Sequence, residues 1–333
     1  MADLFDSKML GDLLLQHVDA PPSSLSFTPV RTGKHNRSFW VDSDAGRFVL
    51  RIAPRDDTPD DPRFLFYERL MMRQEPALHA LIASETELPV AEILAADFSR
   101  RRIDRDYLLM RALPGTPMSD AYDLGREERS RALYQVGRLL RELHTLNARE
   151  HLDTAPAVDG AVYGYLGAHH PMEGQTNWAD AFHVMWNKLL DDVVACGTYT
   201  NDEARQYRKL LDTYITLFDR PVTPSLLHMD VWSQNILVDR HGNVTGLVDF
   251  DRALWGDIEI EFAVLDYCGI SEPPFWEGYG KPRDTSPEAT IRQRFYLLYE
   301  IQKYMPIRVW RSNRPKDALR YRRTCRSLAA QLN

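Results

Sequence analysis

Cysteine is scarce in this chain of 333 residues, and its three copies, Cys196, Cys268 and Cys325, lie far apart. Disulfide frameworks and structural zinc sites need paired or closely spaced cysteines. We therefore expect free thiols in a reducing cytoplasm, and neither a disulfide-stabilised secreted domain nor a zinc domain.

Long apolar runs and an excess of positive charge are also absent. No run approaches the roughly 20 apolar residues of a membrane-spanning helix, and the N-terminal Met-Ala-Asp-Leu-Phe-Asp is acidic, unlike a secretion signal. The net charge of −7 gives no general signal for nucleic-acid binding. We expect a cytoplasmic globular protein that acts on small molecules, with neither nucleic acid nor membrane as a partner.

The positive charge is concentrated near the C-terminus. Between Ala289 and Asn333 there are eleven lysines and arginines but only two acidic residues. A solvated face of C-terminal helices is the preferred interpretation. The alternative is attraction for anionic groups of a substrate or nucleotide.

One short polar segment carries the most chemical information. Asp230 and Asn235 are five residues apart on a predicted loop, and Asp249 follows at the end of an apolar run. A phosphoryl-transfer site needs a carboxylate that orients a hydroxyl and accepts its proton. It also needs an amide oxygen and a second carboxylate that bind Mg²⁺. The spacing predicts Asp230 as the catalytic base and Asn235 and Asp249 as magnesium ligands.

The segments LLHMDVWSQNILVD (226–239) and GLVDFDRALWGDIEIEFA (246–263) resemble the aminoglycoside phosphotransferase and choline kinase group, a small-molecule branch of the protein-kinase fold. The chain departs from the group's pattern at three positions. Met229 replaces a glycine, Ile258 replaces a proline, and Glu261 stands where aspartate is usual. None of these changes removes a group that would touch metal or phosphate.

The resemblance implies a glycine-containing loop over the phosphates of ATP or GTP, because only backbone without bulky side chains approaches them closely. Gly33 and Asn36 match the group's loop, which lies between two predicted strands. The expected phosphate-binding residues are Gly33, Lys34, His35, Asn36, Arg37 and Ser38.

The resemblance also implies a cation on the next strand and an acid that holds it. Arg51 stands where the group usually has lysine, although arginine is larger and planar. Glu75 is the expected partner, with Glu68 as its competitor, and Pro76 suggests that a helix begins near Glu75. The hinge that reads the purine is expected at Met110, Arg111 and Ala112.

The order of predicted elements fits an α+β, protein-kinase-like bilobal fold. Residues 1–112 form the expected β-rich, nucleotide-binding lobe, and residues 113–333 the larger helical lobe that carries catalysis and acceptor binding. Within the first lobe we expect a helix from Phe64 to Ser84 and a strand from Leu88 to Ala96. In the second, helices are expected at 126–146, 178–195 and 202–218, the last capped by Asn201 or Asp202.

The sequence thus predicts a small-molecule kinase that transfers the γ-phosphoryl group of ATP or GTP to a hydroxyl of an antibiotic or metabolite. The arginine-rich C-terminus favours a neutral or anionic acceptor over a polycationic aminoglycoside. Three alternatives stay open: a nucleotide-binding pseudokinase or regulatory module, a protein kinase, and a hydrolase in which His228 and Asp230 bind the metal. A protein kinase is disfavoured because no activation segment ending in Ala-Pro-Glu follows Asp249. A hydrolase is disfavoured because Asp249 is the only obvious further metal ligand.

Overall fold

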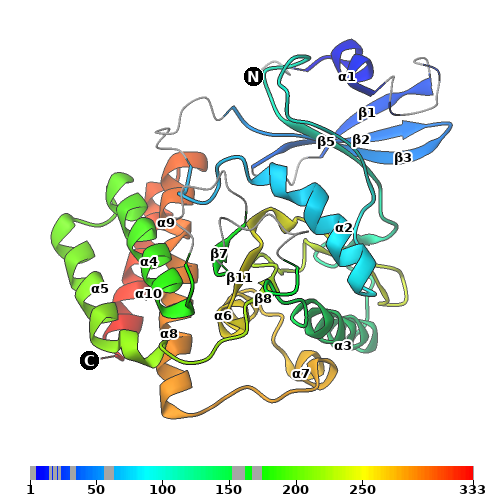
Figure 1. The fold of residues 1–333 in the computed structure, drawn as a ribbon. Coiled ribbons are helices and arrows are strands. Elements are labelled where there is room, and N and C mark those ends of the chain that lie inside the picture. Colours follow the sequence, from blue (N-terminus) through cyan, green and yellow to red (C-terminus); the bar gives the residue numbers. More distant parts are fainter. Residues whose placement is uncertain are drawn as a thin grey trace.

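The computed structural model describes residues 5–14, 17, 21, 24–30, 35–55, 64–151, 162–166 and 175–332. An antiparallel sheet forms the N-terminal part, and helices dominate the rest of the chain (Figure 1). This arrangement agrees with the α+β architecture expected from the sequence. None of the helices in the described ranges is both long and apolar enough to cross a membrane.

The N-terminal sheet has the strand order β1-β2-β3-β5-β4. Its strands are β1 (Ser26–Val30), β2 (Arg37–Ser43), β3 (Gly46–Ile52), β4 (Ile93–Asp97) and β5 (Tyr107–Arg111). Helix α1 (Ser7–Leu14) buries Leu10, Leu13 and Leu14 in the same apolar cluster as alternate residues of β2 and β3. The strand expected from Leu88 is shorter and starts at Ile93. Pro89 has no N–H for a sheet hydrogen bond, and its carbonyl accepts from the Leu247 amide at 3.0 Å.

The helix expected from Phe64 is also shorter than predicted. A 3₁₀ turn, η2 (Met71–Gln74), leads into α2 (Glu75–Glu85), and residues 64–70 are not helical. Leu70 has a left-handed backbone with φ of 53°, which interrupts any continuous helix. Pro76 lies in the first turn of α2, where its missing N–H costs nothing. The predicted helix start near Glu75 is thus confirmed, and the predicted start at Phe64 is wrong.

The C-terminal part is built from helices around two small sheets. The helices are α3 (Arg126–Leu143), α4 (Trp178–Ala195), α5 (Asn201–Tyr214), α6 (Ile258–Tyr267), α7 (Pro273–Tyr279), α8 (Pro287–Gln302), α9 (Tyr304–Pro306) and α10 (Pro315–Ala329). Two 3₁₀ turns, η3 (Ile215–Leu217) and η4 (Phe250–Arg252), and a π-helix, η5 (Ile307–Arg311), complete them. The N-cap of α5 is Thr200 rather than Asn201 or Asp202, because Thr200 and Glu203 form a capping box.

A β-hairpin follows the loop that carries Asp230 and Asn235. Strands β9 (Ile236–Val238) and β10 (Val244–Leu247) pair antiparallel, and β6 (Thr116–Pro117) joins them on the other edge of β9. The second sheet has the order β7 (Gly164–Tyr165), β11 (Leu254–Gly256) and β8 (Ser225–Leu227). Asp230 and Asn235 therefore lie between β8 and β9, and Asp249 is the second residue after β10.

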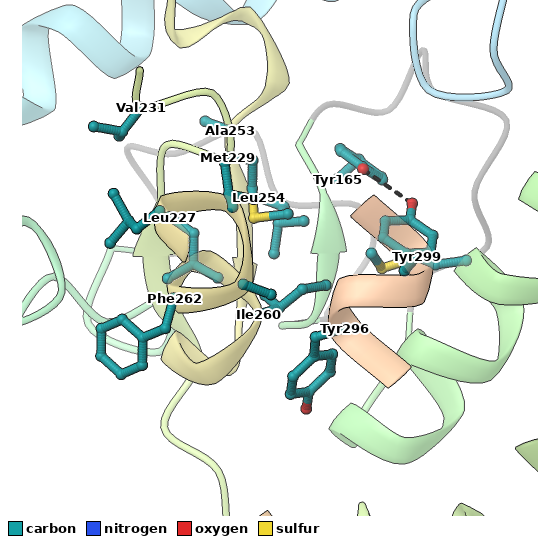
Figure 2. Packing of buried hydrophobic residues seen from close by; sticks show 14 of the residues in the cluster. Tyr165, Leu227, Met229, Val231, Ala253, Leu254, Ile260, Phe262, Tyr296 and Tyr299 are labelled. Atoms are coloured by element: carbon teal, nitrogen blue, oxygen red, sulfur yellow. Dashed lines mark hydrogen bonds between the residues drawn. The ribbon is translucent and has the colours of Figure 1, made fainter. Parts of the chain in front are cut away.

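Buried side chains pack around the residues on either side of Asp230 (Figure 2). Met229 and Val231, which flank Asp230, belong to one large apolar cluster with Leu254 and Ile260. In the same cluster the hydroxyls of Tyr165 and Tyr299 lie 3.0 Å apart and satisfy each other away from water. The loop of Asp230 is thus fixed by packing on both sides of the acid.

The basic C-terminal segment is not one solvated face. Arg292 and Lys303 are buried and pair with Glu259 and Glu300 respectively. Arg314, Lys316, Arg320 and Arg323 are exposed, as the preferred interpretation of the sequence expects. Arg308 and Arg311 line the cavity described below. The three cysteines are free thiols, in agreement with the sequence.

Candidate active site

A cavity of about 650 Å³ brings the predicted site residues together. The N-terminal sheet contributes Ser38, Trp40, Val49 and Met110, and the polar segment contributes Asp230, Asn235 and Asp249. The end of α6 and the α9–η5 region supply a third group: Tyr267, Cys268, Tyr304, Ile307, Arg308 and Arg311. Residues nearly 300 positions apart in sequence thus face one space, where a nucleotide and an acceptor could meet.

A strained turn presents Asp230 to the cavity. Met229 has φ of 64°, a left-handed conformation that glycine adopts without cost and methionine does not. Two hydrogen bonds to the buried Glu261 carboxylate stabilise this unfavourable backbone conformation. The amide N–H of Met229 donates to Oε1 at 2.7 Å, and that of His228 donates to Oε2 at 3.1 Å. Glu261 therefore anchors α6 to the turn, despite standing where the resembling group has aspartate.

Two histidines brace the same turn and are not placed as metal ligands. The Nδ1 atom of His228 accepts from the amide of Asp230 at 3.2 Å, and its Nε2 lies 3.1 Å from the carbonyl of Val248. His144, which caps α3, lies 2.9 Å from Glu261 through Nε2. Because both ring nitrogens of His228 are occupied, the geometry disfavours a hydrolase-type metal site at His228 and Asp230.

The electrostatic surroundings keep Asp230 ionised. Burial raises the pKa of the Asp230 carboxyl, but the charges of Arg252 and Lys303 outweigh burial and hold this pKa below its ordinary value. The nearest cation is Arg252, whose Nη1 lies 3.1 Å from Oδ1 of Asp230. A carboxylate in this state can accept a hydrogen bond from an acceptor hydroxyl.

Asn235 and Asp249 offer the oxygen donors that Mg²⁺ prefers. The Nδ2 group of Asn235 donates to the Asp230 carbonyl at 2.9 Å, which leaves its Oδ1 free for a metal. Asp249 has φ of 73° and lines the cavity with its side chain partly exposed. No cluster of three acidic, histidine or cysteine ligands exists among the described residues. Mg²⁺ in kinases is held by one or two protein groups plus phosphates, so this donor set fits it.

Arg51 lies at the centre of a buried group of carboxylates. Its Nη1 contacts Glu75, its Nη2 lies 2.8 Å from Oδ1 of Asp249, and Asp251 is 3.6 Å away. Arg51 is only 8% exposed, so a solvent-facing role for this strand residue is excluded. Although burial disfavours the charged guanidinium, the neighbouring carboxylates hold the pKa of Arg51 above its ordinary value.

Glu68, the competitor of Glu75, has a different position. Its Oε1 accepts from Nη2 of Arg311 at 2.6 Å and lies 3.6 Å from Arg252. Burial raises the pKa of Glu68, but the charges of Arg311 and Arg252 help to outweigh burial and hold this pKa below its ordinary value. Glu75 is therefore the acid that contacts Arg51, and Glu68 holds two arginines on the other side of the cavity.

The expected phosphate loop is described only in part. His35, Asn36 and Ser38 line the cavity, whereas the side chain of Arg37 is exposed. Gly33 and Lys34 lie outside the described residues. Burial lowers the pKa of His35 to about 4, so its ring is neutral near pH 7, and Nδ1 can accept from Arg311 at 3.1 Å.

The expected hinge is placed beside the cavity, and two of its amides are already occupied. Met110 and Arg111 line the cavity, and Ala112 does not. The N–H groups of Arg111 and Ala112 donate to the backbone carbonyls of Glu92 and Arg47, at 2.9 and 3.0 Å. The next residue, Leu113, lines the cavity and is the better candidate for donating a backbone N–H to a purine.

Sequence reasoning missed several residues of the site. Asp251 and Arg252 directly follow Asp249 and Phe250, so their position beside the motif was the available signal. Arg308 and Arg311 carried no motif, because only the fold brings the C-terminal segment to the cavity. The excess of arginine in that segment was the sole indication.

Comparisons with known proteins agree with this geometry. The sequence profile of the phosphotransferase enzyme family matches residues 26–281. A probable ketoamine kinase of Staphylococcus aureus (strain NCTC 8325 / PS 47) is 25% identical over 292 residues, which cover 84% of this chain and 86% of that protein. The hygromycin-B 4-O-kinase of Escherichia coli is 24% identical over 240 residues, which cover 69% of this chain and 59% of that protein.

Solved structures show the same fold. A putative fructosamine-3-kinase from Haemophilus somnus 129PT superposes with a TM-score of 0.70 at 16% identity, over 98% of this chain and 97% of that one. A thermostable aminoglycoside phosphotransferase APH(4)-Ia, in ternary complex with AMP-PNP and hygromycin B, gives a TM-score of 0.64 at 18% identity, over 96% and 98%. The chain therefore belongs to the phosphotransferase enzyme family and is a small-molecule O-phosphotransferase with a kinase-like fold.

Proposed function

We propose that this protein transfers the γ-phosphoryl group of ATP or GTP to a hydroxyl of a small neutral or anionic acceptor. The observation that carries the proposal is the convergence of Asp230, Asn235, Asp249 and Arg51 on one cavity. Asp230 orients the acceptor hydroxyl and accepts its proton. Positioning and charge stabilisation supply most of the remaining catalysis in phosphoryl transfer, because little covalent chemistry is left to the protein.

The nucleotide is proposed to lie under the N-terminal sheet, within a lobe of residues 1–112. Arg51, held by Glu75, clamps the α- and β-phosphates, and the loop that includes His35, Asn36 and Ser38 covers them. Asn235 and Asp249 hold Mg²⁺, which neutralises charge on the phosphates. The remainder of the chain, residues 113–333, carries Asp230 and binds the acceptor.

The acceptor class is proposed from the relatives and from the charge of the cavity. Relatives named ketoamine kinases match most of the chain, so ketoamines are the first acceptors to test. A hygromycin-B kinase is also a relative, which keeps hydroxylated antibiotics in the panel. Arg252, Arg308 and Arg311 line the cavity and disfavour a polycation such as kanamycin. A catalytically silent nucleotide-binding module is disfavoured, because the proposed base and both metal positions are present.

The experiment is a nucleotide-consumption screen with ATP and GTP, Mg²⁺, and a panel of ketoamines, polyols and antibiotics. We expect acceptor-dependent consumption that falls by about 10²- to 10⁴-fold in Asp230→Asn, the usual range for loss of a general base. Nucleotide binding should be largely unchanged, and unfolding should stay cooperative although loss of the ion pair with Arg252 lowers its midpoint. Undiminished turnover in Asp230→Asn would refute the role of Asp230 as the base. Efficient turnover of kanamycin would refute the proposed neutral or anionic acceptor class.

A further inference from the structure

The π-helix η5 forms one wall of the cavity and lies outside the part of the chain that the family profile matches. Ile307, Arg308 and Arg311 of this helix all line the cavity, and the match ends at residue 281. π-Helical turns are rare and occur mostly at functional sites. The cavity wall at η5 is therefore a feature of this chain that can determine which acceptor fits.

A stack of tyrosines supports Arg308 in this wall. The Tyr267 and Tyr304 rings stack with centroids 5.0 Å apart, and Tyr304 stacks on Tyr321 at 5.3 Å. The Arg308 guanidinium lies 5.9 Å from the Tyr321 ring, and its Nη2 donates to the Tyr321 hydroxyl at 3.5 Å. The supported guanidinium is thereby oriented before any ligand arrives.

Within the part of the chain that the structure describes, Arg308 differs from two other arginines of the cavity, Arg252 and Arg311, in forming no ion pair with a carboxylate. Arg252 pairs with Asp230, and Arg311 pairs with Glu68. Its side-chain hydrogen bond goes to the Tyr321 hydroxyl and not to a carboxylate. Asp251 adds negative charge near Arg252, and Asp317 stabilises the charge of Arg308 without forming an ion pair with it. A guanidinium that lines the cavity without an ion-pair partner among the described residues is suited to an anionic ligand.

We propose that Arg308 binds an anionic group, a carboxylate or a phosphate, on the acceptor whose hydroxyl Asp230 orients. This inference rests on the proposed function and narrows its acceptor from neutral or anionic to anionic. Arg311 acts as a positioning residue: it is fixed by Glu68 and contacts His35 at the phosphate loop, so it connects the acceptor wall to the nucleotide side.

The test measures binding and needs no turnover. Calorimetry is performed on the full chain with AMP-PNP and Mg²⁺, using gluconate, glucitol 6-phosphate and neutral glucitol as matched probes. Fructosylglycine and its carboxamide form a second pair. In at least one series we expect the probe that carries the carboxylate or phosphate to bind roughly 10- to 100-fold more tightly than its counterpart, as a charge-assisted hydrogen bond allows. The preferred probe distinguishes a carboxylate from a phosphate.

Variants assign that preference to Arg308. Arg308→Gln should abolish it, Arg308→Lys should retain part of it, and the exposed Arg323→Gln on α10 should leave it intact. Equal or undetectable binding of all probes by the wild type, or a preference that survives in Arg308→Gln, would overturn the inference. Weaker AMP-PNP binding in Arg308→Gln with unchanged probe binding would also overturn it, since Arg308 would then serve the nucleotide. The proposed function is judged separately, by the dependence of nucleotide consumption on Asp230.

Discussion

Arg252 and Asp230 form an ion pair within the cavity, with 3.1 Å between Nη1 and Oδ1. Both residues line the space in which the acceptor is proposed to bind. The pair joins the proposed base to the arginines of the acceptor wall, since Arg252 also approaches Glu68 at 3.6 Å.

Removal of Arg252 should change the pH dependence of the reaction. In the wild type, burial raises the pKa of Asp230, and Arg252 and Lys303 more than offset it, so the carboxylate persists below its ordinary pKa. In Arg252→Gln less positive charge offsets the effect of burial, so the pKa of Asp230 rises. On acidification the carboxylate is then protonated, and the base lost, at a higher pH than in the wild type. We expect the acid limb of the kcat/KM profile to move to higher pH. A limb that does not move, with Arg323→Gln as the matched control, would show that Arg252 does not set this pKa.

Arg51 and Glu75 should behave as one unit. Arg51→Met removes the cation from three carboxylates, and breaking such a buried pair costs about 3–5 kcal/mol of unfolding free energy. The double variant Arg51→Met with Glu75→Gln should be more stable than Arg51→Met alone, because it no longer buries an unpaired Glu75. Urea unfolding of the four proteins in this cycle gives the coupling energy. Losses of unfolding free energy that are additive in the double variant would argue against the pair. Both single variants should also raise the KM for the nucleotide.

Magnesium dependence should follow Asp249 and Asn235. Chelation with EDTA is expected to abolish nucleotide consumption, and added Mg²⁺ to restore it. Asp249→Asn and Asn235→Ala should each require at least about tenfold more Mg²⁺ for half-maximal rate, because each loses an oxygen donor or its orientation. Glu203→Gln, on the distant helix α5, is the control. Titration curves for Mg²⁺ that coincide in all four proteins would remove both residues from the metal site.

Glu261 should be essential for the turn that carries Asp230. Glu261→Ala leaves the buried N–H groups of His228 and Met229 without their acceptor, and each such loss costs about 1–3 kcal/mol. We expect a lower urea midpoint and a lower kcat, with a smaller effect in Glu261→Gln, which keeps one acceptor oxygen. Equal stability of wild type and Glu261→Ala would show that packing alone maintains the left-handed Met229.

Much of the fold was predictable because local patterns dictate it. The periodic leucines of α3 predicted a buried helical face, and Leu133, Val136, Leu139, Leu140 and Leu143 are all buried. The motif around Asp230 predicted a loop, then an apolar run that ends in a second acid, and the structure has them in this order. The errors arose where backbone chemistry interrupts a pattern: Leu70 has a left-handed backbone within an apparently helical stretch, and Pro89 lies in an apparent strand that starts only at Ile93.

The sequence by itself determined the reaction type, since the residue types and spacing of Asp230, Asn235 and Asp249 suffice to indicate phosphoryl transfer. The resemblance to the phosphotransferase group also indicated Glu75 as the acid that holds Arg51. Only the tertiary structure decided that Glu68 pairs with arginines and that Arg308 and Arg311 reach the cavity. The physical reason is that these contacts join residues up to 276 positions apart, as in His35 and Arg311. Local propensity carries no information about such long-range approach, which depends on how the helices pack.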